Sequence, residues 1–338
     1  MTAGPVTLVV DAAAPAPDAI ARAAAVIRAG GLVAMPTETV YGLAGNALSP
    51  ESIARIYAAK ARPSHNPLIA HVADAAQAQS LAAEWPEMAR ALAARFWPGP
   101  LTLVVRRKAI VPTALTAGLD TFGVRVPDHP VALALIRAAG VPLAAPSANR
   151  FTEVSPVTAA QVARGLGAAV DLILDAGHTR VGIESSVVDV SGGRPVLLRP
   201  GMITQQELEA VVGPVSRHRG VTHDREARPA PGMVARHYAP RAQVRLVAAG
   251  TLRAAVEAVR RDDASAAVGA LTHSVEPVEG LRFARRLPDA PNGYAAALYD
   301  ALHDADAAGC TALFIETVPD DSAWDAIRDR LTRAAHPE

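Results

Sequence analysis

The chain has 338 residues, of which 50% are hydrophobic and 4% are aromatic, and its 33 basic residues balance its 33 acidic residues. The zero net charge excludes a polyelectrolyte, and the length is sufficient for two domains that each bury a core. No apolar run reaches about 18 residues, and no positive-then-apolar leader opens the chain. We therefore expect a cytoplasmic protein that does not enter a membrane.

The first predicted element is an alanine-rich helix at residues 18–29, in which apolar side chains recur on one face. Gly30 follows it, and glycine commonly ends a helix in this position. The apolar run 31–35 then predicts a short buried strand.

Residues 36–71 are the most informative stretch of the chain. A polar loop with two glycines follows the strand, and Ser49 and Pro50 then open a helix. That helix ends in the basic turn 60–67, after which residues 68–72 predict a second strand. Loops held by rigid elements often bear functional residues, so this stretch indicates a site. An ordinary strand–helix–strand unit with two ordinary turns would give the same pattern.

The following region continues as mixed helices and strands. Helices are predicted at 74–83, 86–96, 129–139 and about 204–212, with a further helix beginning at Pro156. Strands are predicted at 101–105, 121–126, 141–145 and 171–174, and as an antiparallel pair at 183–190 and 194–199.

Residues 215–243 differ in character, because they contain six arginines against only two acids, Asp224 and Glu226. We interpret them as a linker. Beyond it, strands and helices alternate, which predicts a small α/β domain with a parallel sheet and right-handed crossovers. The expected organisation is therefore a catalytic domain at 1–214, a linker or lid at 215–243, and a C-terminal domain at 244–338.

Two residue types are rare enough to be informative. Lys60 and Lys108 are the only lysines, and an ammonium group suits the binding of phosphate. Two surface lysines with no special role would look the same. The single cysteine, Cys310, lies in an apolar run, which indicates a buried strand rather than a reactive thiol.

Several familiar sites are absent from the sequence: a phosphate-binding GxxxxGK[ST] loop, a GxGxxG motif after a strand, and a cysteine or histidine cluster with zinc spacing. Hydroxyl, amide and basic side chains instead follow the strand ends. These are Thr37, Thr39, Lys60, Arg62, Thr121, Arg125, Ser147, Asn149, Ser155, Ser185, Ser186 and Arg199. Such groups bind anions by charge-assisted hydrogen bonds and offer no obvious nucleophile. The expected mechanism is positioning and charge stabilisation, as in phosphoryl and nucleotidyl transfer.

Each of these residues also has a structural interpretation. Ser147 and Ser185 could cap helices or turns. Arg125 lies in an apolar run and therefore needs a partner or an anionic ligand, since an unpaired buried charge is costly. Histidines such as His71 are more often ordinary core or surface residues than ligands. The residues alone thus indicate the binding of an anionic, phosphorylated small molecule.

A set of motifs occurs along the chain in the order of a known family. They are Pro36-Thr-Glu-Thr-Val-Tyr-Gly42, Lys60-Ala-Arg-Pro63, Asn66-Pro-Leu68, Trp97-Pro-Gly-Pro-Leu-Thr102, Thr116-Ala-Gly-Leu-Asp-Thr121, Val124-Arg-Val-Pro127, Pro146-Ser-Ala-Asn149, Glu184-Ser-Ser186, Leu198-Arg-Pro-Gly201, Pro231-Gly-Met233 and His237-Tyr-Ala-Pro240. Together they resemble the YrdC-like threonylcarbamoyl-AMP synthases, in the two-domain form with an extra C-terminal domain. The resemblance covers essentially the whole chain.

The resemblance implies a nucleotidyltransferase that joins L-threonine, bicarbonate and ATP into threonylcarbamoyl-AMP and pyrophosphate. Separate transfer proteins would then pass the threonylcarbamoyl group to an adenosine beside the tRNA anticodon. The implied fold is α/β: a twisted open mixed sheet with a large concave cavity, followed by a smaller Rossmann-like domain. Mg2+ is expected with ATP, and we assign no protein residue as a metal ligand.

The resemblance also implies roles for individual residues. For ATP these are Lys60, Arg62, Asn66, Thr121, Ser147, Ser155 and Arg199, with Gly232, His237 and Tyr238 of the linker. Lys60 and Arg62 would also stabilise the charge that develops on pyrophosphate. The implied threonine pocket consists of Thr39, His71, Arg125, Ala145 and Ser185, with Arg125 at the amino acid carboxylate.

Two other functions compete with this one. An RNA-binding module without nucleotidyl transfer would also use basic residues, but the zero net charge and few aromatic residues argue against high affinity, so we expect direct contact with tRNA to be weak. A carbamoyl-transferring enzyme with a related domain would need additional zinc-finger and transfer domains, which this chain lacks.

Overall fold

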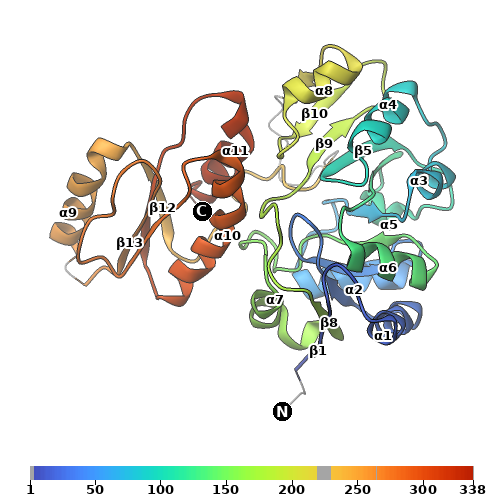
Figure 1. Ribbon diagram of the computed structural model, residues 1–338, viewed down its shortest axis with the longest axis horizontal. Coiled ribbons are helices and arrows are strands. Elements are labelled where there is room, and N and C mark those ends of the chain that lie inside the picture. The colour runs from blue at the N-terminus through green and yellow to red at the C-terminus, as the bar shows by residue number, and fades with distance from the viewer. Residues whose placement is uncertain (1–3, 219–229, 264, 338) are drawn as a thin grey trace. The chain divides into compact units, whose positions relative to one another are not determined.

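The computed structural model describes residues 4–218, 230–263 and 265–337 (Figure 1). The chain divides into two compact units. The first comprises Met1–Phe151 and Pro156–Met233, and the second comprises Thr152–Ser155 and Val234–Glu338. The change from the first unit to the second at Met233 falls inside the predicted linker, whose residues 219–229 lie outside the described part of the chain.

The first unit is built on an 11-stranded mixed sheet with the strand order β1-β8-β2-β3-β7-β4-β6-β5-β9-β10-β11. Its strands are β1 (Val6–Val9), β2 (Val33–Met35), β3 (Gly42–Asn46), β4 (Ile69–His71), β5 (Leu101–Arg106), β6 (Thr121–Arg125), β7 (Leu143–Ala144), β8 (Leu172–Asp175), β9 (Ser186–Asp189), β10 (Val196–Arg199) and β11 (Ser216–Arg217). Parallel and antiparallel pairs both occur, since β6 runs parallel to β4 and antiparallel to β5. The expected mixed α/β sheet and the antiparallel pair β9–β10 are confirmed.

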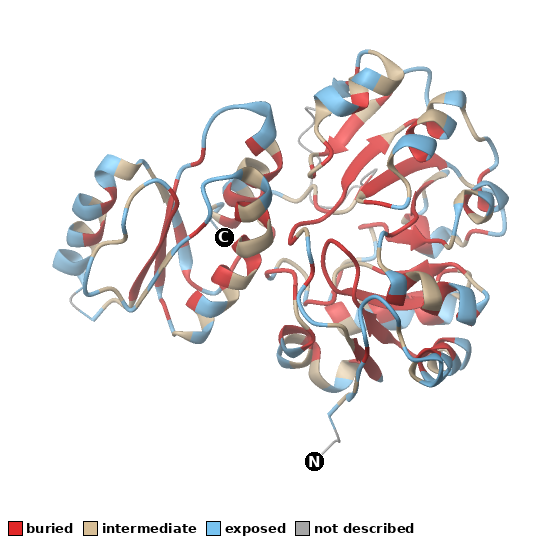
Figure 2. Cartoon of the chain, in the orientation of Figure 1, coloured by how far each residue is buried: buried red, intermediate tan, exposed pale blue. Residues whose placement is uncertain are grey.

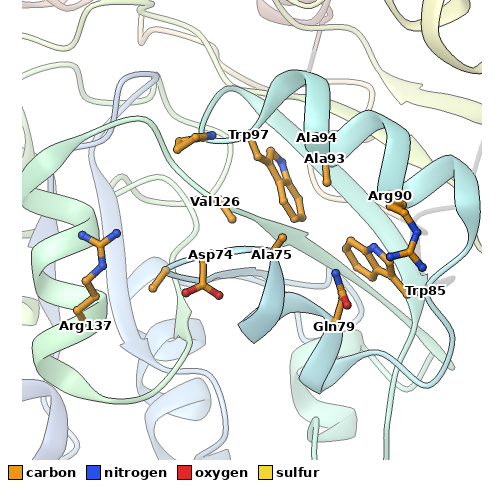
Figure 3. A pocket seen from close by; sticks show the side chains of 12 residues that line it. Asp74, Ala75, Gln79, Trp85, Arg90, Ala93, Ala94, Trp97, Val126 and Arg137 are labelled. Carbon is orange, nitrogen blue, oxygen red and sulfur yellow. The ribbon is translucent and has the colours of Figure 1, made fainter.

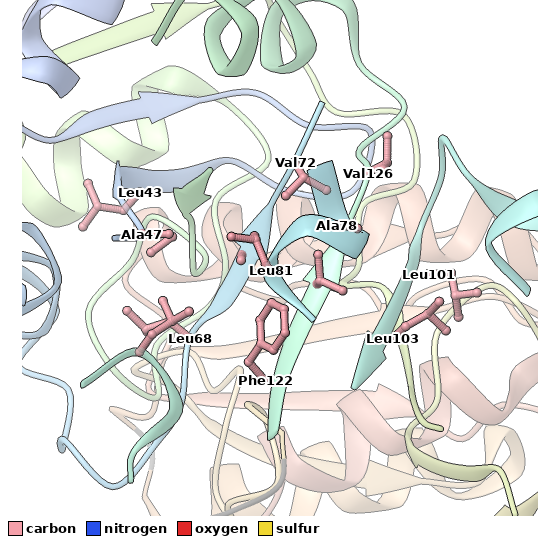
Figure 4. Packing of buried hydrophobic residues seen from close by; sticks show 14 of the residues in the cluster. Leu43, Ala47, Leu68, Val72, Ala78, Leu81, Leu101, Leu103, Phe122 and Val126 are labelled. Atoms are coloured by element: carbon pink, nitrogen blue, oxygen red, sulfur yellow. The ribbon is translucent and has the colours of Figure 1, made fainter. Parts of the chain in front are cut away.

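Helices cover both faces of this sheet. They are α1 (Pro17–Arg28), α2 (Pro50–Lys60), α3 (Ala75–Leu81), α4 (Glu87–Phe96), α5 (Thr113–Thr116), α6 (Pro130–Ala139), α7 (Ala159–Leu166) and α8 (Gln205–Val212). In β2, Val33 and Met35 pack in one core cluster and Ala34 packs in the other, as expected when side chains alternate across a strand. Figure 4 shows part of the larger cluster, in which Leu81 of α3 packs over Phe122 of β6. The central strands are buried, whereas the edge strands β1 and β11 are largely exposed and most helices expose one face (Figure 2).

One prediction for the first unit is wrong. The polar loop expected after the first strand contains strand β3, which pairs with β2 and β7. Gly42 and Gly45 suggest a loop, but in β3 their lack of a side chain allows neighbouring residues to pack closely. A Cβ atom added at Gly45 would lie 3.1 Å from side-chain atoms of both Leu32 and Ile56. The short helix α5 also escapes the sequence pattern.

The second unit contains a four-stranded, wholly parallel sheet with the order β12-β15-β13-β14. Its elements are β12 (Gln243–Val247), α9 (Leu252–Asp262), β13 (Val268–Thr272), β14 (Phe283–Arg286), α10 (Pro291–Ala307), β15 (Ala312–Glu316) and α11 (Asp325–Ala334). The predicted parallel α/β domain is therefore confirmed. Cys310 is buried just before β15, and burial raises the pKa of its thiol. In the described part of the chain, no helix is both long and apolar enough to cross a membrane.

Candidate functional site

The loop after β2 is held by the hydroxyl group of Thr37. Thr37 Oγ1 donates to the carbonyl of Val40 at 2.6 Å and accepts the backbone N–H groups of Thr39 and Val40, each at 3.2 Å. Thr37 and Thr39 Oγ1 atoms lie 2.8 Å apart. Because the single proton of Thr37 goes to Val40, the Thr39 hydroxyl is the donor in this contact. The loop thus buries polar side chains in a fixed arrangement.

Arg125, at the end of β6, reaches this loop from across the sheet. Its Nη2 atom lies 2.6 Å from Glu38 Oε1 and donates to Thr39 Oγ1 at 3.0 Å. Its Nε atom donates to the carbonyl of Gly99 at 3.2 Å. The sequence requires a partner or an anionic ligand for this buried arginine, and Glu38 is that partner. The remaining nitrogen, Nη1, makes no hydrogen bond or ion pair to any residue that the structure describes.

His71 is the register partner of Arg125 on the neighbouring strand β4. Burial and then the nearby Arg125 lower the pKa of His71 to about 3, so the imidazole is neutral at physiological pH. Its Nδ1 atom is buried and has no hydrogen-bond partner within the described ranges. A neutral, unsatisfied imidazole nitrogen beside Arg125 can take a polar group of a ligand.

A second group of site residues surrounds the end of α2. Lys60 is 1% exposed, and its Nζ atom donates to the carbonyls of Ser147 and Asn149, each at 2.5 Å. Ala61 adopts a left-handed conformation with φ 49°, which ends the helix. Arg62 then donates to the carbonyls of Asn66 and Pro67 at 3.2 and 3.0 Å. The structure therefore brings together Lys60, Arg62, Asn66 and Ser147, and their role toward ATP remains a prediction.

A third group joins residues that were predicted for different substrates. Arg199 Nη2 donates to Ser185 Oγ at 3.2 Å, and Arg199 Nε donates to the Ser185 carbonyl at 3.1 Å. The hydroxyl of Thr102 lies 2.8 Å from the same Ser185 oxygen. Arg199 Nη1 also donates to the carbonyl of Pro231 at 3.3 Å. The predicted threonine ligand Ser185 and the predicted ATP ligand Arg199 are therefore in direct contact.

The other predicted residues of the first unit lie on its strands and turns. Thr121 begins β6, and Ala145 directly follows β7 and packs against Gly42. Gly232 has φ +84°, in the left-handed region that glycine favours, and follows the Pro231 carbonyl that Arg199 contacts.

Three predicted ATP residues belong to the second unit. The backbone carbonyl of Ser155 lies 3.2 Å from Nε2 of the His303 ring, and the backbone N–H of His237 donates to the Arg333 carbonyl at 3.3 Å. The ring of Tyr238 stacks on Tyr299 with 5.9 Å between centroids. These contacts describe the second unit alone, so the expected part of these residues in the ATP site stays a prediction.

Sequence reasoning missed Glu38, Thr102 and the Gly99 carbonyl. A signal for Glu38 was present: an acid in a buried loop and an arginine in an apolar strand are complementary buried charges. No local signal identifies Gly99, because Arg125 contacts its backbone carbonyl oxygen, which every residue has.

Two cavities of the first unit are lined by other residues. One has a volume of about 450 Å³ and is lined by Trp85, Trp97, Pro98, Val126 and Arg137, among others (Figure 3). The other, of about 610 Å³, includes Tyr57, Ser64 and His65 in its lining. None of the predicted site residues lines either cavity.

Comparisons with known proteins agree along most of the chain. Residues 25–201 match the Sua5, YciO and YrdC family described as "Telomere recombination", and residues 203–336 match the family described as "Threonylcarbamoyl-AMP synthase, C-terminal domain". The threonylcarbamoyl-AMP synthase of Bacillus subtilis is 42% identical over 325 residues, covering 94% of this chain and 92% of the relative. The protein of that name from Pyrococcus abyssi is 41% identical, covering 93% of each chain.

A solved structure supports the same assignment. The crystal structure of Pyrococcus abyssi Sua5 complexed with L-threonine has a TM-score of 0.91 and 39% identity, covering 98% of this chain and 97% of that chain. The buried arginines, hydroxyls and lysine described above lie in the motifs that this chain shares with the family. This chain belongs to the threonylcarbamoyl-AMP synthase family.

Proposed function

We propose that this protein synthesises threonylcarbamoyl-AMP from L-threonine, bicarbonate and ATP, with release of pyrophosphate. The observation that carries the proposal is the contact between Ser185 and Arg199. The Arg199 guanidinium, which is predicted to bind ATP, donates a hydrogen bond to the Ser185 hydroxyl, which is predicted to bind threonine. Such a contact suits a reaction that joins the two substrates.

The amino acid would bind at Arg125. The Nη1 edge of this guanidinium has no partner within the described ranges, and a carboxylate is its natural acceptor. Neutral His71 beside it adds no positive charge that would repel the amino group of the substrate. The pocket therefore suits a zwitterionic amino acid.

The chemistry needs no protein nucleophile. The threonine amine attacks the carbon of CO2 formed from bicarbonate, loses a proton, and becomes a carbamate. A carbamate oxygen then attacks the α-phosphorus, and the bond to pyrophosphate breaks. Lys60, Arg62 and Arg199 would bind the phosphates and stabilise the charge that develops on pyrophosphate.

Mg2+ would accompany ATP and neutralise part of the phosphate charge. In the parts of the chain that the structure describes, no three His, Cys, Asp or Glu side chains come together as a metal site. The donor set therefore fits an ion held mainly by the phosphates and water, as Mg2+ often is. The protein's own contribution would be the basic groups around the phosphates.

The product would serve the threonylcarbamoyl modification of tRNA next to the anticodon. We propose that separate transfer proteins in the cytoplasm consume it, because an acyl-adenylate is an activated donor. Direct contact of this chain with tRNA would be weak, consistent with its zero net charge.

A pyrophosphate-release assay tests this function. Release should require L-threonine, bicarbonate and ATP together and stop when any one is omitted. Release without threonine would overturn the proposal, and salt-dependent RNA binding with no ATP turnover would favour the RNA-binding alternative.

A further inference from the structure

We propose that Glu38 is a positioning residue that makes the Arg125 pocket selective for an amino acid over phosphate. The inference rests on the proposed function in one respect, namely that the substrate of this pocket is an amino acid. Glu38 acts through Arg125 by fixing the orientation of the guanidinium and compensating its charge.

The two charges form a fully buried pair. Glu38 is 1% exposed and Arg125 is 4% exposed, and 2.6 Å separates Oε1 from Nη2. At this burial water screens the charges only weakly, so the two groups dominate each other's electrostatic environment. Within the described residues, neither oxygen of Glu38 has a hydrogen-bond partner of good geometry. The carboxylate is therefore held mainly by the charge of Arg125 rather than by a hydrogen-bonded scaffold.

The contacts of Arg125 show what this pair does to the guanidinium. Glu38 and Thr39 face Nη2, and the Gly99 carbonyl accepts from Nε. Two hydrogen-bond acceptors, the Thr39 hydroxyl and the Gly99 carbonyl, and the charge of Glu38 thus hold one edge of a planar group. With that edge fixed, the Nη1 edge can point in only one direction, which is the preorganisation that binding a carboxylate requires.

The charge balance gives the pair a second effect. The ligand-binding groups of the first unit are strongly basic, with Lys60, Arg62 and Arg199 all buried, and ATP and pyrophosphate are polyanions. An uncompensated Arg125 would attract those phosphates as readily as a carboxylate. With Glu38 beside it the local charge sums to zero, which favours a zwitterion over a polyanion.

The test compares Glu38→Gln, which removes the charge and keeps the shape, with the wild type. We expect the KM for L-threonine to rise about tenfold to a hundredfold, the scale for a misplaced binding group, with the KM for ATP nearly unchanged. Inorganic phosphate should become a competitive inhibitor against threonine in the variant only. Unchanged threonine KM with no phosphate competition would overturn the inference.

A double-mutant cycle tests whether Glu38 acts through Arg125. In the Arg125→Gln background, Glu38→Gln should cause little further loss of threonine affinity. An equal loss in both backgrounds would mean direct contact with the substrate and would refute a positioning role. Asp171→Asn is the matched control, because it removes the carboxylate of the Arg55–Asp171 pair, whose side chains are 48% and 42% exposed.

A second variant and a binding measurement distinguish a loss of folding from a loss of threonine binding. Glu38→Asp retains the charge with a shorter reach, so it should keep phosphate out while weakening threonine binding, even if Glu38→Gln does not fold. Calorimetric titration with L-threonine compares the variants without turnover. A wild type that binds threonine but releases no pyrophosphate contradicts the proposed function alone, whereas active enzyme with unaltered Glu38→Gln kinetics contradicts this inference alone.

Discussion

Ser185 Oγ accepts a hydrogen bond from Arg199 Nη2 at 3.2 Å, and the Thr102 hydroxyl lies 2.8 Å from the same oxygen. Ser185 precedes β9, Arg199 ends β10, and Thr102 lies on β5, so three strands converge on one hydroxyl group. This convergence links the expected threonine pocket to the expected phosphate site.

Ser185→Ala should therefore lower kcat/KM by about tenfold or more and raise the KM for both threonine and ATP. The substitution leaves Arg199 without its side-chain acceptor. Thr102→Val provides the matched control, because it removes only the other contact of Ser185 and keeps the one to Arg199. Steady-state pyrophosphate release measures both variants, and an equal or larger defect in Thr102→Val would contradict the role given to Arg199.

Lys60→Ala and Arg62→Ala should each reduce adenylate formation by about tenfold or more, the scale for losing one well-placed electrostatic group. Lys60 also donates hydrogen bonds to the carbonyls of Ser147 and Asn149, so the turn at the end of α2 and residues 147–149 would be held together less firmly. Lys108→Ala is the control, because Nζ of this other lysine donates to the Ser80 carbonyl at 3.0 Å and to no further residue among those the structure describes. Near-wild-type threonine-dependent pyrophosphate release by both variants would exclude this assignment.

His71 should make the protein less stable in acid. Its pKa is about 3 in the folded state, mainly because of burial, and about 6.5 in an unfolded chain. Between these values the unfolded state binds a proton that the folded state does not. The free energy of unfolding should thus fall as the pH falls through this window, by at most about 1.4 kcal/mol per pH unit.

Urea unfolding of His71→Gln and the wild type at pH 7, 5 and 4 measures this effect. The variant should show a shallower loss of stability with acidification, whereas His336→Gln, at an exposed position near the C-terminus, should follow the wild type. Equal pH dependence in His71→Gln and the wild type would argue against a neutral buried imidazole.

Gly201→Ala should destabilise the first unit by about 2–4 kcal/mol. A Cβ atom at this position would lie 2.2 Å from the Ser186 backbone nitrogen and 2.7 Å from Ser186 Oγ, so the backbone beside Ser185 would have to move. Gly192→Ala is the control, since no atom lies within 4 Å of the added Cβ. Thermal unfolding of both variants checks the prediction, and similar melting temperatures would contradict it.

Several features follow from local sequence because their causes are local. Helix α2 begins where Ser49 caps the backbone N–H of Ser52 and Pro50 occupies the first turn. Helix α1 ends before Gly30, whose φ of +81° suits glycine. The parallel second unit follows from the alternation of apolar strands with amphipathic helices. The site motifs are short and contiguous, so they too can be recognised in the sequence.

Strand β3 and the Glu38–Arg125 pair depend on contacts between distant segments, so local sequence does not predict them. Gly42 and Gly45 suggested a loop, because nothing nearby in the sequence shows that Ala145, Leu32 and Ile56 pack against them. Glu38 and Arg125 are far apart in the chain, and the register of β4 with β6 and the buried turn at Thr37 bring them together. The fold class, most of the helices and the chemical types of the site residues can thus be predicted from the amino-acid sequence. Which buried charges and hydroxyls meet can be seen only in the folded chain, because those distances depend on sheet register and on side-chain packing between segments that no local pattern connects.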